Sequence, residues 1–68
     1  MNVHVFYDRE HTRSNIQLEN KARVKDLLKK MDINPLTALV SRNDSLLLED
    51  ESLDDSDEIK LISVISGG

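Results

Sequence analysis

Only one stretch of this chain has the apolar spacing of a helix, and runs that alternate as strands do flank it on both sides. In NKARVKDLLKKMD the apolar side chains fall at i, i+3, i+4 and i+7, at Val24, Leu27, Leu28 and Met31. This spacing places them on one face of a helix. Asn20 is the expected N-cap, and Pro35 ends the pattern. A chain with a single helix must bury that face against a sheet.

The alternating runs predict the strands of that sheet. Residues 2–7 and 14–20 alternate around a polar loop, which predicts an antiparallel hairpin. Residues 37–42 and 46–49 are shorter β-like runs on either side of the turn signal NDS, and residues 58–65 form the longest strand pattern. The predicted fold is α+β, a β-grasp with a mixed sheet of four to five strands packed on one helix. Periodicity alone also permits a ferredoxin-like half or another small α+β roll.

Length and composition limit what such a chain can do. Sixty-eight residues make one domain, which we place at residues 1–65, with a flexible Ser-Gly-Gly tail at 66–68. The chain has no cysteine, so it has no disulfide and no thiolate ligand. We see no signal peptide and no apolar run near the ~20 residues that span a bilayer. We therefore expect a cytoplasmic protein that does not bind membranes.

Charge is unevenly distributed along the chain. Residues 49–58 hold seven of the thirteen acidic residues and no base, within a net charge of −4. This segment reads as a solvated loop, as a docking surface for a basic partner or, least readily, as a metal site. An EF-hand needs a glycine and fixed ligand spacing that the segment lacks. The only aromatic side chains that could stack on bases are Phe6 and Tyr7, and the basic residues are diluted by neighbouring acidic ones. We therefore expect no nucleic-acid binding.

We expect no catalytic residue and no metal site, and thus no enzyme. No serine stands in a glycine elbow, and no glycine precedes Gly67, which excludes a glycine-rich phosphate loop. His4 is expected to point outward from its strand, and His11 to lie in an exposed loop.

The outward positions of the first and last strands predict a candidate interface. If Val3, Val5, Ile59 and Leu61 face the core, the opposite face carries another set: His4, Phe6, Ile62 and Val64. Three of these four are apolar, and a contiguous exposed apolar patch often marks an interface. The alternative is a patch that is small or covered by a loop.

The end of the chain suggests a substrate for another protein. Ser66, Gly67 and Gly68 extend about 10 Å past the last strand. Glycines without Cβ atoms pass through narrow slots, and the terminal carboxylate is ionised at neutral pH. A carboxylate reacts as an acyl donor only after its oxygen becomes a good leaving group, as in an acyl-adenylate. A frayed terminus is the simpler alternative.

The last fifteen residues, DDSDEIKLISVISGG, resemble the end of the ubiquitin-like sulfur-carrier family. The family is typified by the small subunit of molybdopterin synthase (MoaD) and the thiamin-biosynthesis sulfur carrier (ThiS). Ubiquitin-related modifiers and archaeal ubiquitin-like small modifier proteins are related to it. The shared pattern is an acidic turn, an apolar strand and Gly-Gly, and the order of elements agrees along the whole chain. Ser56 stands where the family usually has glycine.

The resemblance implies that a ubiquitin-activating-type adenylyltransferase adenylates Gly68 with ATP and Mg²⁺, which that partner uses. Sulfur from a persulfide donor then replaces AMP and gives a thiocarboxylate. A downstream acceptor enzyme uses this sulfur in thiamin, molybdopterin or tRNA thiolation pathways. The docking face would include His4, Phe6, Ile62 and Val64.

Other functions remain open at this point. The protein is alternatively a modifier joined through Gly68 to lysines of target proteins. It is otherwise a β-grasp interaction module whose Gly-Gly end is incidental, or an enzyme in its own right.

Overall fold

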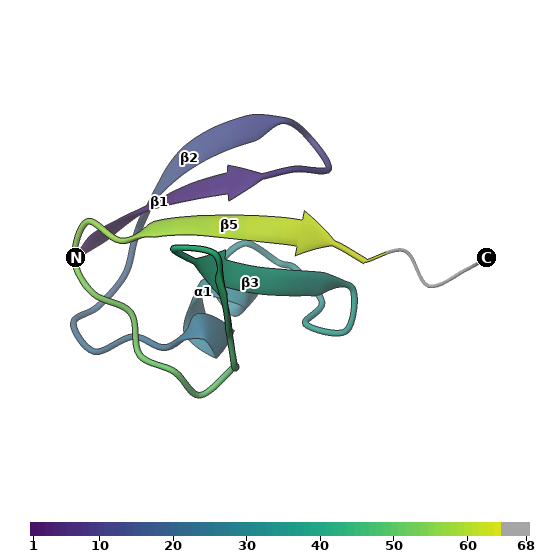
Figure 1. Cartoon of the computed structure of the whole chain (residues 1–68). Helices are drawn as coiled ribbons and strands as arrows, with labels where there is room; N and C mark the ends of the chain where they lie inside the picture. Colours follow the sequence, from purple (N-terminus) through teal and green to yellow (C-terminus); the bar gives the residue numbers. More distant parts are fainter. Residues whose placement is uncertain (65–68) are drawn as a thin grey trace.

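The computed structural model describes residues 1–64, and Ile65 to Gly68 lie outside the described residues. One helix and five strands follow in the order β1 (Asn2–Tyr7), β2 (Thr12–Gln17), α1 (Val24–Lys30), β3 (Ala38–Arg42), β4 (Ser45–Leu47) and β5 (Glu58–Ser63). The strands form one sheet in the order β2-β1-β5-β3-β4 (Figure 1). The prediction of a β-grasp with a mixed sheet on one helix is confirmed.

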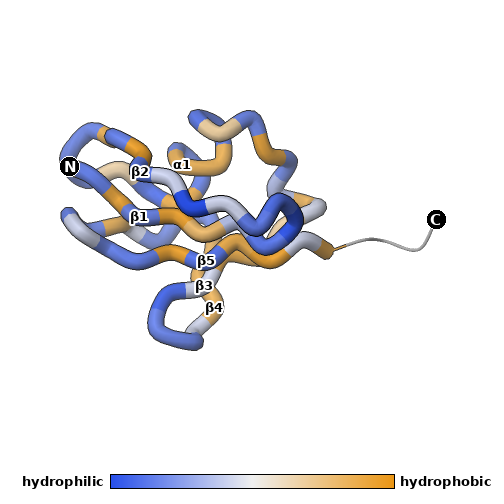
Figure 2. The backbone as a smooth tube through the Cα atoms, turned by 90° about the horizontal axis from the view of Figure 1, so that it is seen from above, coloured by the Kyte–Doolittle hydropathy of each residue, from blue (hydrophilic) through white to orange (hydrophobic). Residues whose placement is uncertain are grey.

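The first and last strands pair at the centre of the sheet. β1 and β5 are parallel, with Val5 opposite Ile59 and Tyr7 opposite Leu61. β2 flanks β1 as an antiparallel hairpin, and β3 flanks β5 in antiparallel register. β5 therefore pairs with β1 over residues 58–61 and with β3 over residues 59–63, so it has a strand on each side. Figure 2 shows the apolar stretches of β1 and β5 side by side, with hydrophilic connections around them.

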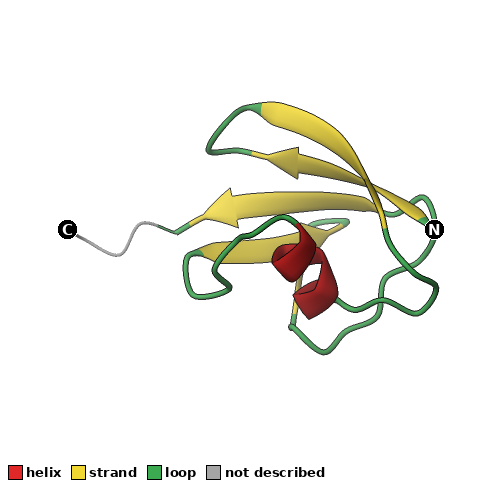
Figure 3. Ribbon diagram, turned by 180° about the vertical axis from the view of Figure 1, so that it is seen from behind, coloured by secondary structure: helices red, strands yellow, loops and turns green. Residues whose placement is uncertain are grey.

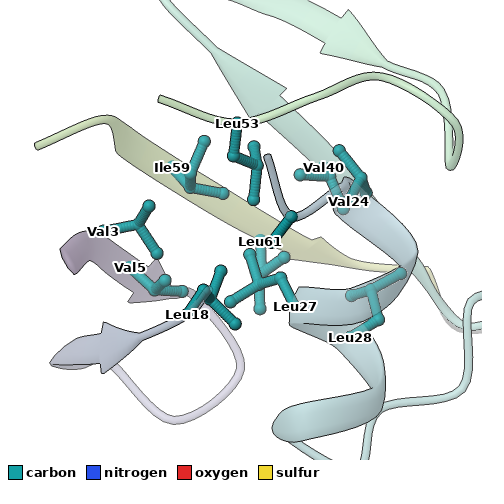
Figure 4. Packing of buried hydrophobic residues seen from close by; sticks show 11 residues of the cluster. Val3, Val5, Leu18, Val24, Leu27, Leu28, Val40, Leu53, Ile59 and Leu61 are labelled. Carbon is teal, nitrogen blue, oxygen red and sulfur yellow. The ribbon is translucent and has the colours of Figure 1, made fainter. Parts of the chain in front are cut away.

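The core lies between one face of this sheet and α1, which covers that face (Figure 3). Val3 and Val5 from β1, and Ile59 and Leu61 from β5, are each at most 2 % exposed, as their alternation predicted. In Figure 4 these side chains point toward the apolar side chains of α1. Further members of the cluster are Leu18, Ala22, Val24, Leu27, Leu28, Val40 and Leu53. Full burial of a Val, Leu or Ile side chain contributes about 1.5–3 kcal/mol.

The predicted N-cap at Asn20 is wrong, because α1 begins only at Val24 with Arg23 as its N-cap. Lys21 has a φ of 68°, which no helix residue adopts. The first helical amide groups bind carbonyls of the acidic segment instead: Val24 N–H donates to Glu51 O at 2.9 Å, and Lys25 N–H to Glu49 O at 3.0 Å. Main-chain acceptors from far along the chain thus do the work that a capping side chain does elsewhere.

The hairpin strand β2 starts and ends earlier than its apolar pattern predicted. It covers Thr12–Gln17 rather than residues 14–20. Thr12 lies opposite Tyr7, so pairing with β1 draws polar residues of the predicted loop into the strand. Leu18 is buried just past the end of β2, and Ile16 packs against the core. Among residues 1–64 no helix has the length and apolar character needed to cross a membrane.

Tight turns in this fold are made without glycine. Asn43 and Asp44 have φ values of 53° and 66° and join β3 to β4, which matches the NDS turn signal. These two positive values are typical of a two-residue hairpin turn, and asparagine and aspartate tolerate them better than most residues do. Ser56 has a φ of 66° in the turn from Asp54 to Asp57. Ser56, at the position where the family usually has glycine, therefore adopts the left-handed backbone conformation although it has a Cβ atom.

Replacing Ser56 by glycine should stabilise the domain by about 1 kcal/mol. Glycine removes the left-handed penalty of about 1–2 kcal/mol and loses part of the gain to the greater entropy of the unfolded chain. Chemical unfolding monitored by circular dichroism measures the change. Ser52→Gly is the matched control: Ser52 is exposed in the same segment without a positive φ, so that change should destabilise. Equal loss of stability in both variants would contradict the account of this turn.

Candidate functional site

The first part of the site is the end of β5, where the described chain leaves the sheet. The Ser63 N–H donates to the Asp8 carboxylate at 2.9 Å. The next amide, Val64 N–H, donates to Thr37 O at 2.8 Å. Gly68, Gly67 and Ser66, predicted as the attachment residue and its tail, lie outside the described residues. The structure therefore describes the chain up to Val64, two residues before Ser66.

The second part is the outer face of the sheet, opposite α1. His4 is exposed, Phe6 and Ile62 are half-buried, and Val64 is 41 % exposed. The alternation of β1 and β5 puts His4, Phe6 and Ile62 on the face opposite the buried residues, as predicted.

The register separates Phe6 from the apolar residues of β5. Phe6 lies opposite Lys60 on one side and Arg13 on the other. Ile62 instead lies opposite Leu39 of β3, and Leu39 is 44 % exposed. Phe6 and Ile62 are therefore diagonal neighbours, and the charged Lys60 and Arg13 lie directly beside Phe6.

An apolar strip therefore crosses the β5–β3–β4 half of the outer face. We define it by Leu39, Leu46, Ile62 and Val64. Leu46 of β4 is 62 % exposed and pairs with Ser41 of β3, so it is a diagonal neighbour of Leu39 on the same face. The sequence analysis missed Leu39 and Leu46, although the alternation in TALVSR already placed Leu39 opposite the buried Val40. Exposed apolar side chains that lie close together often mark interfaces, so the strip is a candidate docking surface.

The β1 half of the outer face is polar, with charges of both signs around one aromatic ring. The Arg13 guanidinium lies over the Phe6 ring, 5.9 Å from its centroid, at the outer limit of a cation–π contact. A shallow concave area here has mixed charge, and its lining includes His4, Phe6, Arg13, Lys60, Asp44 and Glu58. A partner that covers the whole face must therefore match an apolar strip beside a polar area that carries charges of both signs around one aromatic ring.

The acidic segment, residues 49–58, has a structural role that the sequence analysis did not predict. Asp55 accepts a hydrogen bond from the Asn2 N–H at 2.8 Å, and Glu51 accepts one from the Leu48 N–H at 2.6 Å. Asp57 accepts the Asp54 N–H at 2.8 Å. Carboxylates that accept main-chain hydrogen bonds stabilise turns, so much of this charge holds the loop in shape. Across residues 1–64 no cluster of three or more His and acidic side chains is arranged to hold a metal ion.

One ion pair ties this segment to the sheet. The Arg42 guanidinium binds the Asp57 carboxylate at 2.8 Å, and the two side chains are only 26 % and 15 % exposed. The hydrogen bond to Asp57 raises the pKa of Arg42 above its usual value, and the negative charges of Asp57, Asp54 and Glu51 add to the effect against the opposing influence of burial. The Arg42 guanidinium therefore stays charged at any physiological pH.

Asp57→Ala should destabilise the domain by about 2 kcal/mol, because it leaves Arg42 and the Asp54 N–H without their carboxylate acceptor. Asp50→Ala is the control: Asp50 pairs with Lys25 at 3.6 Å, with side chains 80 % and 53 % exposed. Loss of such a surface pair should cost no more than about 0.5 kcal/mol. Urea unfolding of the two variants gives the comparison, and equal losses would show that the Arg42–Asp57 pair is no stronger than a surface pair.

The sheet, its single helix and the strand that leads to Gly-Gly define a ubiquitin-like β-grasp protein. Residues 1–65 match the protein family described as small archaeal modifier protein 2. The chain belongs to this family, which confirms the resemblance to ubiquitin-like small modifiers noted in the sequence.

Solved structures agree on the fold. The crystal structure of SAMP1 from Haloferax volcanii superposes with a TM-score of 0.76 at 16 % identity, covering 100 % of both chains. ATBAG1, solved in complex with HSP70, gives a TM-score of 0.74 at 16 % identity over 94 % of this chain and 40 % of that one. At this identity the likeness concerns the fold alone.

Proposed function

We propose that this protein is a ubiquitin-like modifier, joined through the carboxylate of Gly68 to lysine side chains of other proteins. The observation that carries the proposal is membership of the small archaeal modifier protein 2 family, whose match runs to residue 65. The fold supports it, because β5 is the last strand of the described chain and ends at Ser63, four residues before Gly67. From the sequence alone the protein modifier was the alternative to the sulfur carrier, and it is now the hypothesis that we favour.

The chemistry needs an activating partner that uses ATP and Mg²⁺. The Gly68 carboxylate attacks the α-phosphorus of ATP, pyrophosphate leaves, and an acyl-adenylate forms. The amine of a target lysine then attacks the acyl carbon, AMP leaves, and an isopeptide bond remains. The modifier contributes the carboxylate and a docking surface, and the partner, an adenylyltransferase of the ubiquitin-activating type, contributes the catalysis.

Sulfur transfer is the second candidate function, and the absence of cysteine favours it. Sulfur carried by this chain would sit on Gly68 as a thiocarboxylate. A persulfide would attack the same acyl-adenylate and displace AMP, and a thiol of the donor would cleave the S–S bond. A downstream enzyme of thiamin, molybdopterin or tRNA thiolation would receive the sulfur. Both candidates share the first step, which is adenylation of Gly68.

Target lysines should carry a specific eight-residue branch after tryptic digestion. The last basic residue before the end is Lys60, so trypsin leaves Leu61–Gly68, not Gly-Gly, on the modified lysine. Mass spectrometry of proteins from cells that make this chain should find LISVISGG branches. A variant that lacks Gly67 and Gly68 is the control and should give none. If the wild type also gives no such branches, and its intact mass shows that sulfur has replaced an oxygen at Gly68, the protein is a sulfur carrier and not a protein modifier.

The apolar strip should be the surface that the activating partner covers. Leu39→Asp should leave the domain folded, because this side chain points away from the core, and should weaken activation at least tenfold, as loss of a central apolar contact does. Lys29→Asp introduces an aspartate at an exposed position of α1, on the other side of the sheet. This variant should have little effect on activation. ATP–pyrophosphate exchange with the partner measures both. Equal activity of the two variants would remove the strip from the interface.

A further inference from the structure

Asp8 continues the pairing of β1 with β5 beyond the last paired residues. The parallel ladder ends with Tyr7 opposite Leu61. The Asp8 N–H then donates to Leu61 O at 3.1 Å, and its side-chain Oδ1 accepts the Ser63 N–H at 2.9 Å. The carboxylate thus takes the place of a main-chain acceptor, since β1 turns away into the loop to β2 after this residue.

A hydrogen bond also holds the other side of β5, one residue further along the chain. Val64 N–H donates to Thr37 O at 2.8 Å, one residue past the Ser63 contact. The last two described residues therefore bind acceptors on two different loops, one on each side of the strand.

Both acceptors sit on turns that local hydrogen bonds keep in shape. The His11 N–H donates to Asp8 O at 3.3 Å, and His11 has a φ of 51°, which closes the loop after β1. On the other side, the Thr37 N–H and Oγ1 both donate to Asn34 O at 2.9 Å. Acceptors on ordered turns fix the direction in which β5 ends.

We propose that Asp8 is a positioning residue that sets where the sheet releases the chain toward Gly68. The inference rests on the proposed function, in which a partner must receive Gly68. Four residues follow Val64, and they reach at most about 14 Å from it. If the Ser63 contact is lost, the end of β5 can leave the sheet, and the partner must order Ser63 and Val64 again for each turnover. Ordering even one additional residue opposes binding by about a factor of ten.

Three variants in the same loop separate this role from a general effect on stability. Asp8→Ala removes the acceptor. Asp8→Asn keeps an Oδ1 acceptor and should behave like the wild type. Glu10→Ala removes an exposed carboxylate two residues away and serves as the matched control.

Amide hydrogen exchange, followed by NMR, tests the contact without any partner. In Asp8→Ala the exchange of Ser63 and Val64 should accelerate about tenfold, with Ile59 and Leu61 unchanged. Activation by the partner, measured as ATP–pyrophosphate exchange, should show a KM for this protein raised about tenfold at constant kcat. Both effects should be absent in Asp8→Asn and Glu10→Ala.

The outcomes separate the inference from the proposed function. If amide hydrogen exchange at Ser63 is unchanged in Asp8→Ala, the Asp8 carboxylate does not hold the Ser63 amide. Faster exchange with unchanged KM overturns the positioning role. A fall in kcat that Asp8→Asn does not restore overturns it as well, because the carboxylate would then act by more than accepting a hydrogen bond. If no partner activates the wild type, the proposed function fails together with the role in activation, while the exchange rates alone still decide whether Asp8 holds the end of β5.

Discussion

The pairing of β1 with β5 is the contact on which the rest of the structure depends. It brings together residues at the two ends of the chain, Val5 opposite Ile59, and places both strands at the centre of the sheet. The core follows, since each strand contributes two fully buried side chains beneath α1. The exit of the chain follows too, because a central strand is held from both sides up to its last residue. A tail that leaves an edge strand would start from a much less constrained point.

The turns of this domain are formed by polar residues in the left-handed conformation and by carboxylates that accept main-chain hydrogen bonds, where other small domains use glycine. Before Gly67 the sequence has no glycine, and within residues 1–64 six residues adopt positive φ values: His11, Lys21, Asp32, Asn43, Asp44 and Ser56. Around the turn at Ser56, side chains of the acidic segment accept main-chain hydrogen bonds. The consequence for function is that conformational freedom of the glycine kind is confined to Gly67 and Gly68.

Alternation was sufficient to predict the buried faces of β1 and β5, because a period of two leaves only two faces to choose from. It was not sufficient for the outer face, where the neighbour of Ile62 depends on β3 lying next to β5. The helix start was misplaced because its amide groups bind main-chain carbonyls near residue 50, which no local pattern reveals. Asp8 looked like any polar loop residue, since its partner lies 55 residues further along the chain. The tail at residues 66–68 stays a prediction.

The most direct test of the account is whether the Gly68 carboxylate is activated at all. Purified protein is incubated with an extract of cells that make it, ATP, Mg²⁺ and hydroxylamine, which attacks an acyl-adenylate and displaces AMP. The account predicts an ATP-dependent hydroxamate, located by mass spectrometry on the C-terminal peptide Leu61–Gly68. A C-terminal peptide that stays unmodified with ATP present, in an extract that activates another ubiquitin-like protein added as a standard, would contradict it.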